Sequence, residues 1–158
     1  MGAKHKLARC RSIISIFFIS GLLLMSCSGA VSEEDRQAVY NLIEWNLYYA
    51  RIEDMNGYMW TLHPDSPVYS DTQSQMAIAF REFDLAYEIE EWEILSLSSE
   101  SARVRVVQAT RNLADTQSFS DNRIEGIHTL HKNGEDEWKI YSSEFNLDSI
   151  EYLNDLTP

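Results

Sequence analysis

Hydrophobic positions recur with two different spacings along this chain of 158 residues. After an apolar N-terminal segment, Val39, Leu42 and Ile43 begin the three-and-four-residue spacing that places apolar side chains on one face of a helix. Ser32 precedes three acidic residues, which is the pattern of a helix N-terminus because the hydroxyl and the carboxylates favour its free N–H groups. The spacing therefore predicts a helix over residues 33–52.

Two shorter helices are predicted to follow. Asp54 is placed to cap the first of them, which would extend to Trp60 and end at a segment that contains two prolines. Residues 68–70 are predicted as a short strand. A third helix over about 71–84 rests on apolar residues at helical spacing.

Beyond residue 84 the spacing changes to two, which is typical of half-buried strands. The clearest example is Ala102–Arg111, with Val104 and Val106 on one face and arginines on the other. Asn133-Gly134 gives a strong hairpin signal. We predict strands over residues 87–97, 102–111, 123–131 and 137–145, followed by a tail over 146–158 with at most one helical turn. Helices first and antiparallel strands afterwards predict an α+β domain whose helices cover one face of a curved sheet.

The first 27 residues have the layout of an export signal. Residues 1–11 carry four basic side chains, and the next 14 residues, Ser12–Met25, are almost entirely apolar. A bilayer-spanning helix needs about 20 such residues, so this run is too short to be a membrane anchor and is typical of a signal peptide. The run ends at Cys27.

The charge distribution changes at the same place. Removal of residues 1–26 takes away four of the thirteen basic residues and none of the 25 acidic ones, which leaves a net charge of −16. Because nucleic-acid binders need a cationic face to displace counterions from phosphates, we expect no nucleic-acid partner.

Leu24-Met25-Ser26-Cys27 resembles the lipobox of bacterial lipoproteins. The resemblance implies a signal peptide over residues 1–26, a lipid on the Cys27 thiol and a short tether over residues 27–32. It also implies an exported protein anchored to the bacterial membrane, the outer membrane in a Gram-negative cell because Ser28 follows the cysteine. The alternative is an ordinary secretory leader cut after Ala30, which would discard Cys27.

Two segments, Ala102–Arg111 (ARVRVVQATR) and Arg123–Tyr141 (RIEGIHTLHKNGEDEWKIY), resemble the strands and closing hairpin of the nuclear transport factor 2-like (NTF2-like) superfamily, which includes the SnoaL-like cyclases. The resemblance covers residues 33–147 and leaves 148–158 as a C-terminal tail. It implies a cone-shaped NTF2-like fold with a pocket between the helices and the concave sheet face. It also implies a homodimer through the outer sheet face as one candidate assembly.

Aromatic and polar residues supply candidates for the lining of such a pocket, although aromatics at these spacings also suit an ordinary core. The candidates are Trp45, Tyr48, Tyr49, Tyr58, Trp60, Tyr87, Trp92, Gln108 and His128. His128 is the strongest polar candidate because it shares a strand face with apolar residues and Gly126 leaves space beside it. It could serve as a general base or as a hydrogen-bonded structural histidine.

No residue matches a catalytic motif, and no catalytic residue is assigned. The strand glutamates Glu88, Glu90, Glu91, Glu93 and Glu125 are expected to be solvated, and a stripe of Arg103, Arg105 and Arg111 is expected to pair with them across strands. The stripe could alternatively anchor a carboxylated ligand or partner. His128 and His131 lie three apart on a strand and point to opposite faces, so we expect neither a metal site nor a cofactor.

These features favour an envelope lipoprotein that binds a small apolar ligand or a protein partner without catalysis. One alternative is a cofactor-independent isomerase, cyclase or dehydratase of the kind found in the resembling superfamily. The other is an accessory subunit that forms dimers. A buried acid or histidine beside a tyrosine in an enclosed cavity would favour the enzyme, and an exposed apolar sheet face would favour the accessory subunit.

Overall fold

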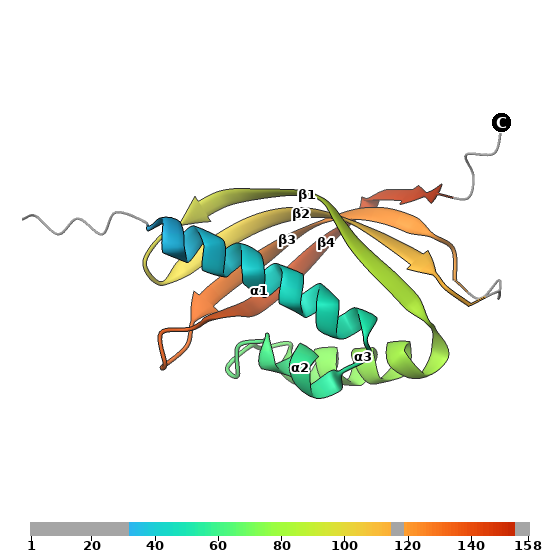
Figure 1. The fold of residues 1–158 in the computed structure, drawn as a ribbon, viewed down its shortest axis with the longest axis horizontal. Coiled ribbons are helices and arrows are strands. Elements are labelled where there is room, and N and C mark those ends of the chain that lie inside the picture. Colours follow the sequence, from blue (N-terminus) through green and yellow to red (C-terminus); the bar gives the residue numbers. More distant parts are fainter. Residues whose placement is uncertain (1–31, 115–118, 154–158) are drawn as a thin grey trace, which may run out of the picture.

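The computed structural model describes residues 32–114 and 119–153. Three helices are followed by four strands (Figure 1). The elements are α1 Glu33–Arg51, α2 Met55–Trp60, α3 Tyr69–Glu82, β1 Leu85–Leu97, β2 Ser101–Asn112, β3 Asn122–Lys132 and β4 Trp138–Tyr152.

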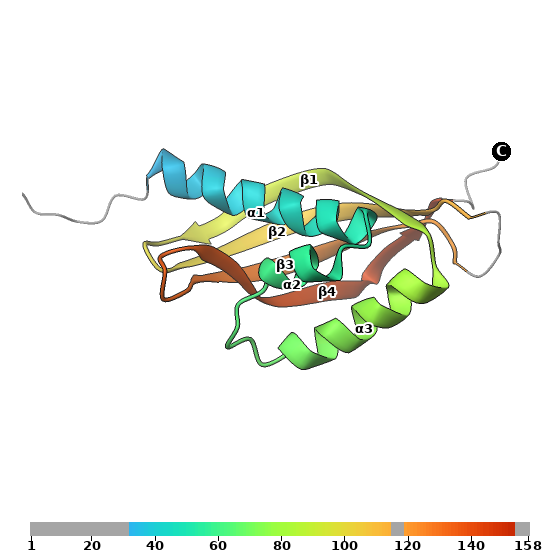
Figure 2. The same cartoon turned by 60° about the horizontal axis from the view of Figure 1, so that its bottom comes forward.

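The strands form one antiparallel sheet in the order β1-β2-β3-β4. The sheet is strongly curved, and α1 crosses its concave side while α2 and α3 lie beyond β4 and the end of α1 (Figures 1 and 2). This arrangement confirms the predicted α+β class with helices on one face of a curved sheet.

Helix α1 forms where the sequence predicts it. The Ser32 hydroxyl caps its N-terminus by accepting from the Asp35 N–H at 3.0 Å. Its apolar face packs into the core, where Val39 and the sheet residues Val104 and Leu130 are fully buried. Burial of side chains of this size contributes roughly 1.5–3 kcal/mol each.

The segment after α2 differs from the prediction. Residues 68–70 are not a strand, because Val68 is the N-cap of α3 and its carbonyl accepts from the Thr72 N–H. The preceding turn is closed by Ser66, whose carbonyl accepts from the Tyr69 N–H. Helix α3 therefore begins two residues earlier than expected, and none of its residues is fully buried.

Strand β4 continues past the predicted end of the domain. Residues 146–152 were expected to be a tail, but a register shift lets the strand resume pairing, with Arg123 opposite Glu151 and Asn122 opposite Tyr152. At the register shift, the Ser149 hydroxyl takes the place of a backbone acceptor and accepts from the Glu125 N–H at 3.0 Å. The fold thus extends beyond residue 147, while residues 154–158 of the predicted tail lie outside the described residues.

A short parallel bridge ties the helices to the sheet edge. The Ile140 N–H donates to the Thr61 carbonyl, and the His63 N–H donates to the Ile140 carbonyl at 2.8 Å. This bridge holds α2 beside β4, so the two elements wall the same interior space.

Residues 1–31 lie outside the described residues, and with them the predicted signal peptide and Cys27. Within 32–114 and 119–153, the search for membrane spans finds no helix with the length and apolarity to cross a bilayer.

Candidate functional site

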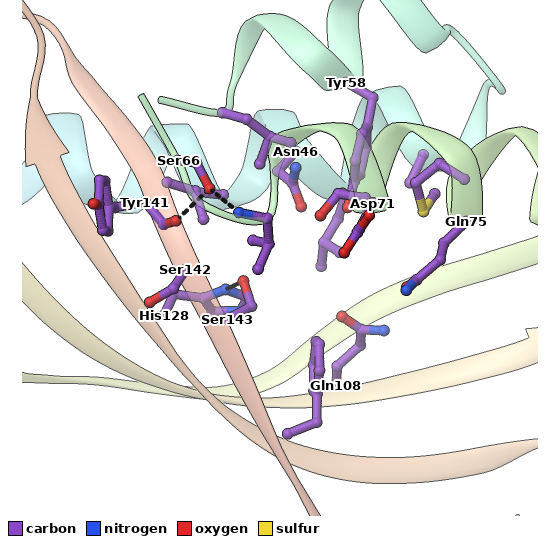
Figure 3. Close-up of a pocket in the computed structure, with 18 of the residues that line it drawn as sticks. Asn46, Tyr58, Ser66, Asp71, Gln75, Gln108, His128, Tyr141, Ser142 and Ser143 are labelled. Atoms are coloured by element: carbon purple, nitrogen blue, oxygen red, sulfur yellow. Dashed lines mark hydrogen bonds between the residues drawn. The ribbon is translucent and has the colours of Figure 1, made fainter. Parts of the chain in front are cut away.

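A cavity of about 410 Å³ lies between the concave face of the sheet and the helices (Figure 3). All seven elements contribute to it. Its apolar wall is formed by Leu47, Ala50, Leu62, Val68, Met76, Ile140 and Phe145, and its polar lining by Asn46, Tyr58, Ser66, Asp71, Thr72, Gln75, Tyr87, Gln108, His128, Tyr141, Ser142 and Ser143.

Four of the nine residues proposed from the sequence line this cavity. Tyr58 comes from α2, Tyr87 from β1, Gln108 from β2 and His128 from β3. The alternation of strands β1 to β3 turns these side chains toward the helices, because their cross-strand partners share the buried face.

Trp45 and Trp60 lie elsewhere. Their rings contact each other at 5.7 Å between centroids, and each is nearly half exposed. They line a separate groove of about 260 Å³ between α1, α2 and the hairpin that joins β3 to β4. The Lys139 ammonium covers the Trp60 ring at 3.6 Å from its centroid.

The other three aromatic candidates also lie outside the cavity lining. Tyr48 is half exposed, and Trp92 packs on Tyr40 with 4.7 Å between ring centroids. Tyr49 packs against Gly57, where an added Cβ would overlap its ring. Tyr48 and Tyr49 lie on α1, and Trp92 on β1 packs against the same helix, but none of the three rings lines the cavity.

His128 is the most deeply buried titratable group of the cavity. Its Nδ1 lies 2.7 Å from the Ser143 Oγ, the only hydrogen bond of its side chain within the described residues. Burial lowers the pKa of His128 to about 4, because the charged ring would lose its hydration. The imidazole is therefore neutral at pH 7.

Phe145 occupies the space beside Gly126 that the sequence left open. A Cβ at residue 126 would lie 2.8 Å from the Phe145 ring, which covers the glycine across the strand pair. The same ring meets His128 edge to face at 6.0 Å between centroids. The space beside Gly126 is thus filled by the Phe145 ring, which forms part of the cavity wall, and is not open to a ligand.

A buried polar network lies at the helical side of the cavity. The Asn46 Nδ2 donates to the Thr61 Oγ1 at 2.7 Å, and the Thr61 hydroxyl donates to the Tyr58 carbonyl. Burial raises the pKa of Tyr58, and burial raises that of Tyr87 to about 12, so both phenols stay protonated at neutral pH. The sequence signal for Asn46 was a polar residue on the apolar face of α1.

Sequence reasoning missed the contribution of α3 and the end of β4. Asp71, Thr72 and Gln75 line the cavity from α3. The amides of Gln75 and Gln108 converge across it (Figure 3). Ser142 and Ser143 follow from a bulge in β4 that changes its register against β3. Helix α3 has no fully buried residues, so its sequence does not mark which side chains face the cavity. A bulge in a strand interrupts the alternation of faces, so periodicity could not identify Ser142 and Ser143 either.

The strand carboxylates lie on the opposite face of the sheet. Arg105 forms ion pairs with Glu91 at 3.2 Å and with Glu125 at 2.6 Å, which confirms the predicted cross-strand pairing for this residue. Within the described residues, Arg103 and Arg111 form no ion pair with a strand glutamate, so the prediction is wrong for these two. Arg123 extends this ladder to Glu90. The neighbouring carboxylates raise the pKa of both arginines, mainly through hydrogen bonds and to a smaller extent through charge attraction. Glutamates that face away from the cavity cannot act on a molecule inside it.

The described part of the chain contains no group of three or more His, Cys, Asp or Glu side chains arranged to hold a metal ion. The arrangement can instead offer hydrogen bonds from a neutral imidazole, three phenols and three side-chain amides. A histidine with a pKa near 4 is a weak base, so it suits hydrogen bonding better than proton abstraction at neutral pH.

Solved structures with this architecture include an NTF2-like protein of unknown function from Pseudomonas putida, with a TM-score of 0.62, 13% identity and coverage of 82% of this chain and 100% of that one. A provisionally assigned aromatic ring hydroxylase from Novosphingobium aromaticivorans has a TM-score of 0.65 and 11% identity, and covers 80% of this chain and 98% of its own. An NTF2-like protein of unknown function from Shewanella oneidensis has a TM-score of 0.55 and 16% identity, with coverage of 70% and 97%. Likeness at these identities shows the fold alone.

A comparison with curated proteins gives no match. The family model for the C-terminal domain of anti-sigma-I factor RsgI9 matches residues 41–153, which span the structure from the middle of α1 to the end of β4. The chain therefore has the NTF2-like fold and belongs to the family of the anti-sigma-I factor RsgI9 C-terminal domain.

Proposed function

We propose that the domain binds a small molecule in the cavity without transforming it. The observation that carries this proposal is the lining itself, whose surface is mostly apolar and whose polar groups, Asp71 apart, are neutral hydrogen-bonding groups. Sites for small ligands have this composition, and a volume of about 410 Å³ lies within their usual range. The family is named after a regulatory protein, in which a ligand-binding domain could receive a signal.

Catalysis of the isomerase, cyclase or dehydratase type has weaker support. Such chemistry needs an acid or base of suitable pKa in contact with the substrate. Asp71 is the only carboxylate among the described residues that line the cavity, and its side chain is exposed on α3. His128 contacts Ser143 rather than a tyrosine hydroxyl.

The accessory-subunit alternative has weaker support as well. The ion-pair ladder of Arg105 and Arg123 crosses the outer sheet face, where a dimer of the predicted kind would bury it. Burial of charged groups opposes association unless every group keeps a partner. A homodimer remains a candidate assembly that sedimentation would detect.

We also propose that the domain is exported and tethered to the membrane through a lipid on Cys27. The stretch from Ser28 to Ser32 spans at most about 17 Å, at roughly 3.4 Å per residue. The 19 residues of α1 span about 28 Å, and the cavity is lined by its second half. The tether therefore leaves the cavity accessible from the aqueous side.

Blocking the cavity tests the binding proposal. Thr72 is half buried on α3 and lines the cavity, so Thr72→Trp would fill the space with little disturbance of the core. We expect the mature protein in lipid nanodiscs to bind more of the neutral fluorescent probe N-phenyl-1-naphthylamine than empty nanodiscs of the same lipid do, and Thr72→Trp to lose at least 90% of that excess. Ser74→Trp, at an exposed position of the same helix that does not line the cavity, is the matched control. Equal binding by both variants and the wild type would contradict the proposal.

Mass spectrometry of the mature N-terminus tests the tether. We expect a chain that begins at Cys27 and carries a diacylglyceryl group, with or without an additional acyl chain on its amino group. A chain that begins at Val31 without fatty acid would show that the leader is an ordinary secretory one.

A further inference from the structure

The charges around the cavity define the class of its ligand. Among the described residues that line it, Asp71 is the only one with an acidic side chain, and Asp71 lies at the exposed rim. The described residues that line the cavity include no arginine or lysine, and the Arg51 guanidinium donates instead to the backbone carbonyl of Tyr87. The interior therefore offers no counter-charge to an anion or to a cation.

A charged ligand would lose its hydration on entering such a space. Transfer of an ion into a poorly hydrated interior is unfavourable unless a partner of opposite charge compensates. A carboxylate or phosphate would also meet Asp71 at the rim and, after removal of residues 1–26, a chain with a net charge of −16. An ammonium could interact with Asp71 but would find no anion deeper in the cavity.

The same lining is equipped for an uncharged polar group. His128 has a second ring nitrogen that makes no hydrogen bond within the described residues, and the first nitrogen is held by Ser143. The Gln108 Nε2 donates to Thr110, which leaves its amide oxygen as an acceptor. Each of these groups can pair with a hydroxyl or a carbonyl, and the apolar wall between them suits a ring system.

Building on the proposed binding role, we infer that the ligand is an uncharged molecule with an apolar ring body and a hydroxyl or carbonyl group. The hydroxyl or carbonyl group pairs with His128 or with the amides of Gln75 and Gln108. Carboxylates, phosphate esters and protonated amines with the same ring body are excluded.

Three probes with one ring body test this inference: 2-naphthalenemethanol, 2-naphthoate and 2-naphthylmethylamine. They are neutral, anionic and cationic at pH 7. Their binding to the mature protein in nanodiscs is measured by calorimetry, with the Thr72→Trp protein in identical nanodiscs as the blank for lipid partitioning. We expect the alcohol to bind at least tenfold more tightly than the carboxylate or the amine.

A charge added at the cavity gives an independent readout. Gln75 is exposed on α3 and lines the cavity, so Gln75→Lys would supply the missing cation without burial of a new charge in the core. We expect Gln75→Lys to strengthen naphthoate binding at least fivefold, whereas Gln73→Lys, on the same helix but outside the lining, leaves it unchanged.

The outcomes separate this inference from the proposed function. If naphthoate or the amine binds the wild type as tightly as the alcohol does, or if Gln75→Lys has no effect on naphthoate, the inference is overturned and the binding role stands. If none of the three probes binds the wild type better than the blocked variant, both the inference and the binding role fail.

Discussion

His128 contributes both to the lining of the cavity and to the buried interior of the fold. Its imidazole is buried and neutral, with Ser143 on one nitrogen and the Phe145 ring against its plane. The lowered pKa follows from burial alone, since no neighbouring charge contributes to it. A neutral buried imidazole keeps both hydrogen-bonding roles available to a ligand, because the proton can reside on either nitrogen.

The lowered pKa makes stability depend on pH in a defined direction. Below pH 6.5 the histidine becomes protonated in the unfolded chain, whereas His128 in the folded chain stays neutral down to about pH 4. The free energy of unfolding therefore falls as the pH falls through this window. A shift of this size corresponds to roughly 3 kcal/mol between pH 7 and pH 4. We expect urea unfolding to show this loss in the wild type and not in His128→Gln. Parallel pH profiles for the two proteins would contradict the account of this residue.

At the scale of elements, the short helix α2 controls one wall of the cavity. It has six residues, which is too few for independent stability, so its form depends on caps and contacts. The Asp54 Oδ1 accepts from the Gly57 N–H at 3.0 Å. After the helix, Thr61 and His63 form backbone hydrogen bonds with Ile140 of β4. The network from Thr61 to Asn46 then fixes α2 against α1 and orients Tyr58.

Removal of the cap should therefore affect both stability and binding. We expect Asp54→Ala to lower the free energy of unfolding by about 1 kcal/mol, and Asp54→Asn, which can still cap, to lower it by much less. Asp65→Ala serves as the control, because the Asp65 carboxylate is exposed and only its backbone N–H is used, in a bond to His63. Chemical denaturation measures all three. An equal loss for Asp54→Ala and Asp54→Asn would show that the cap is not the stabilising contact.

Elements with local signals could be predicted from the sequence, and those fixed by distant contacts could not. The apolar face of α1, the alternation of β2 and the Asn133-Gly134 turn depend on neighbours in the chain. The last part of β4 depends on renewed pairing with β3 after a bulge, and the start of α3 depends on a turn at Ser66.

The candidate site shows the same division at the level of side chains. Tyr87, Gln108 and His128 were predictable because strand alternation assigns a face. Trp45 and Trp60 were not, because an aromatic residue on a helix flank packs against its nearest neighbour, here the other tryptophan. Periodicity locates apolar rings on a helix, but the packing of the neighbouring helix decides which rings reach the cavity.

At the scale of the whole molecule, the two faces of the sheet have separate roles. The concave face and the helices enclose the cavity, and the outer face carries the ladder of arginines and glutamates. The acidic start of α1 would lie next to the proposed lipid, where repulsion from anionic headgroups would hold the domain away from the bilayer. The cavity at the other end of α1 would then face the solution.

The most direct test of the central claim is a proton NMR titration of the histidine ring resonances with 2-naphthalenemethanol. The chain beyond the proposed signal peptide contains three histidines, and neither His63 nor His131 lines the cavity, so these two act as internal references. If the cavity is the binding site, the His128 resonances shift in a saturable manner and by far more than the other two. Saturable binding that leaves the His128 resonances unmoved would place the ligand elsewhere and contradict the account.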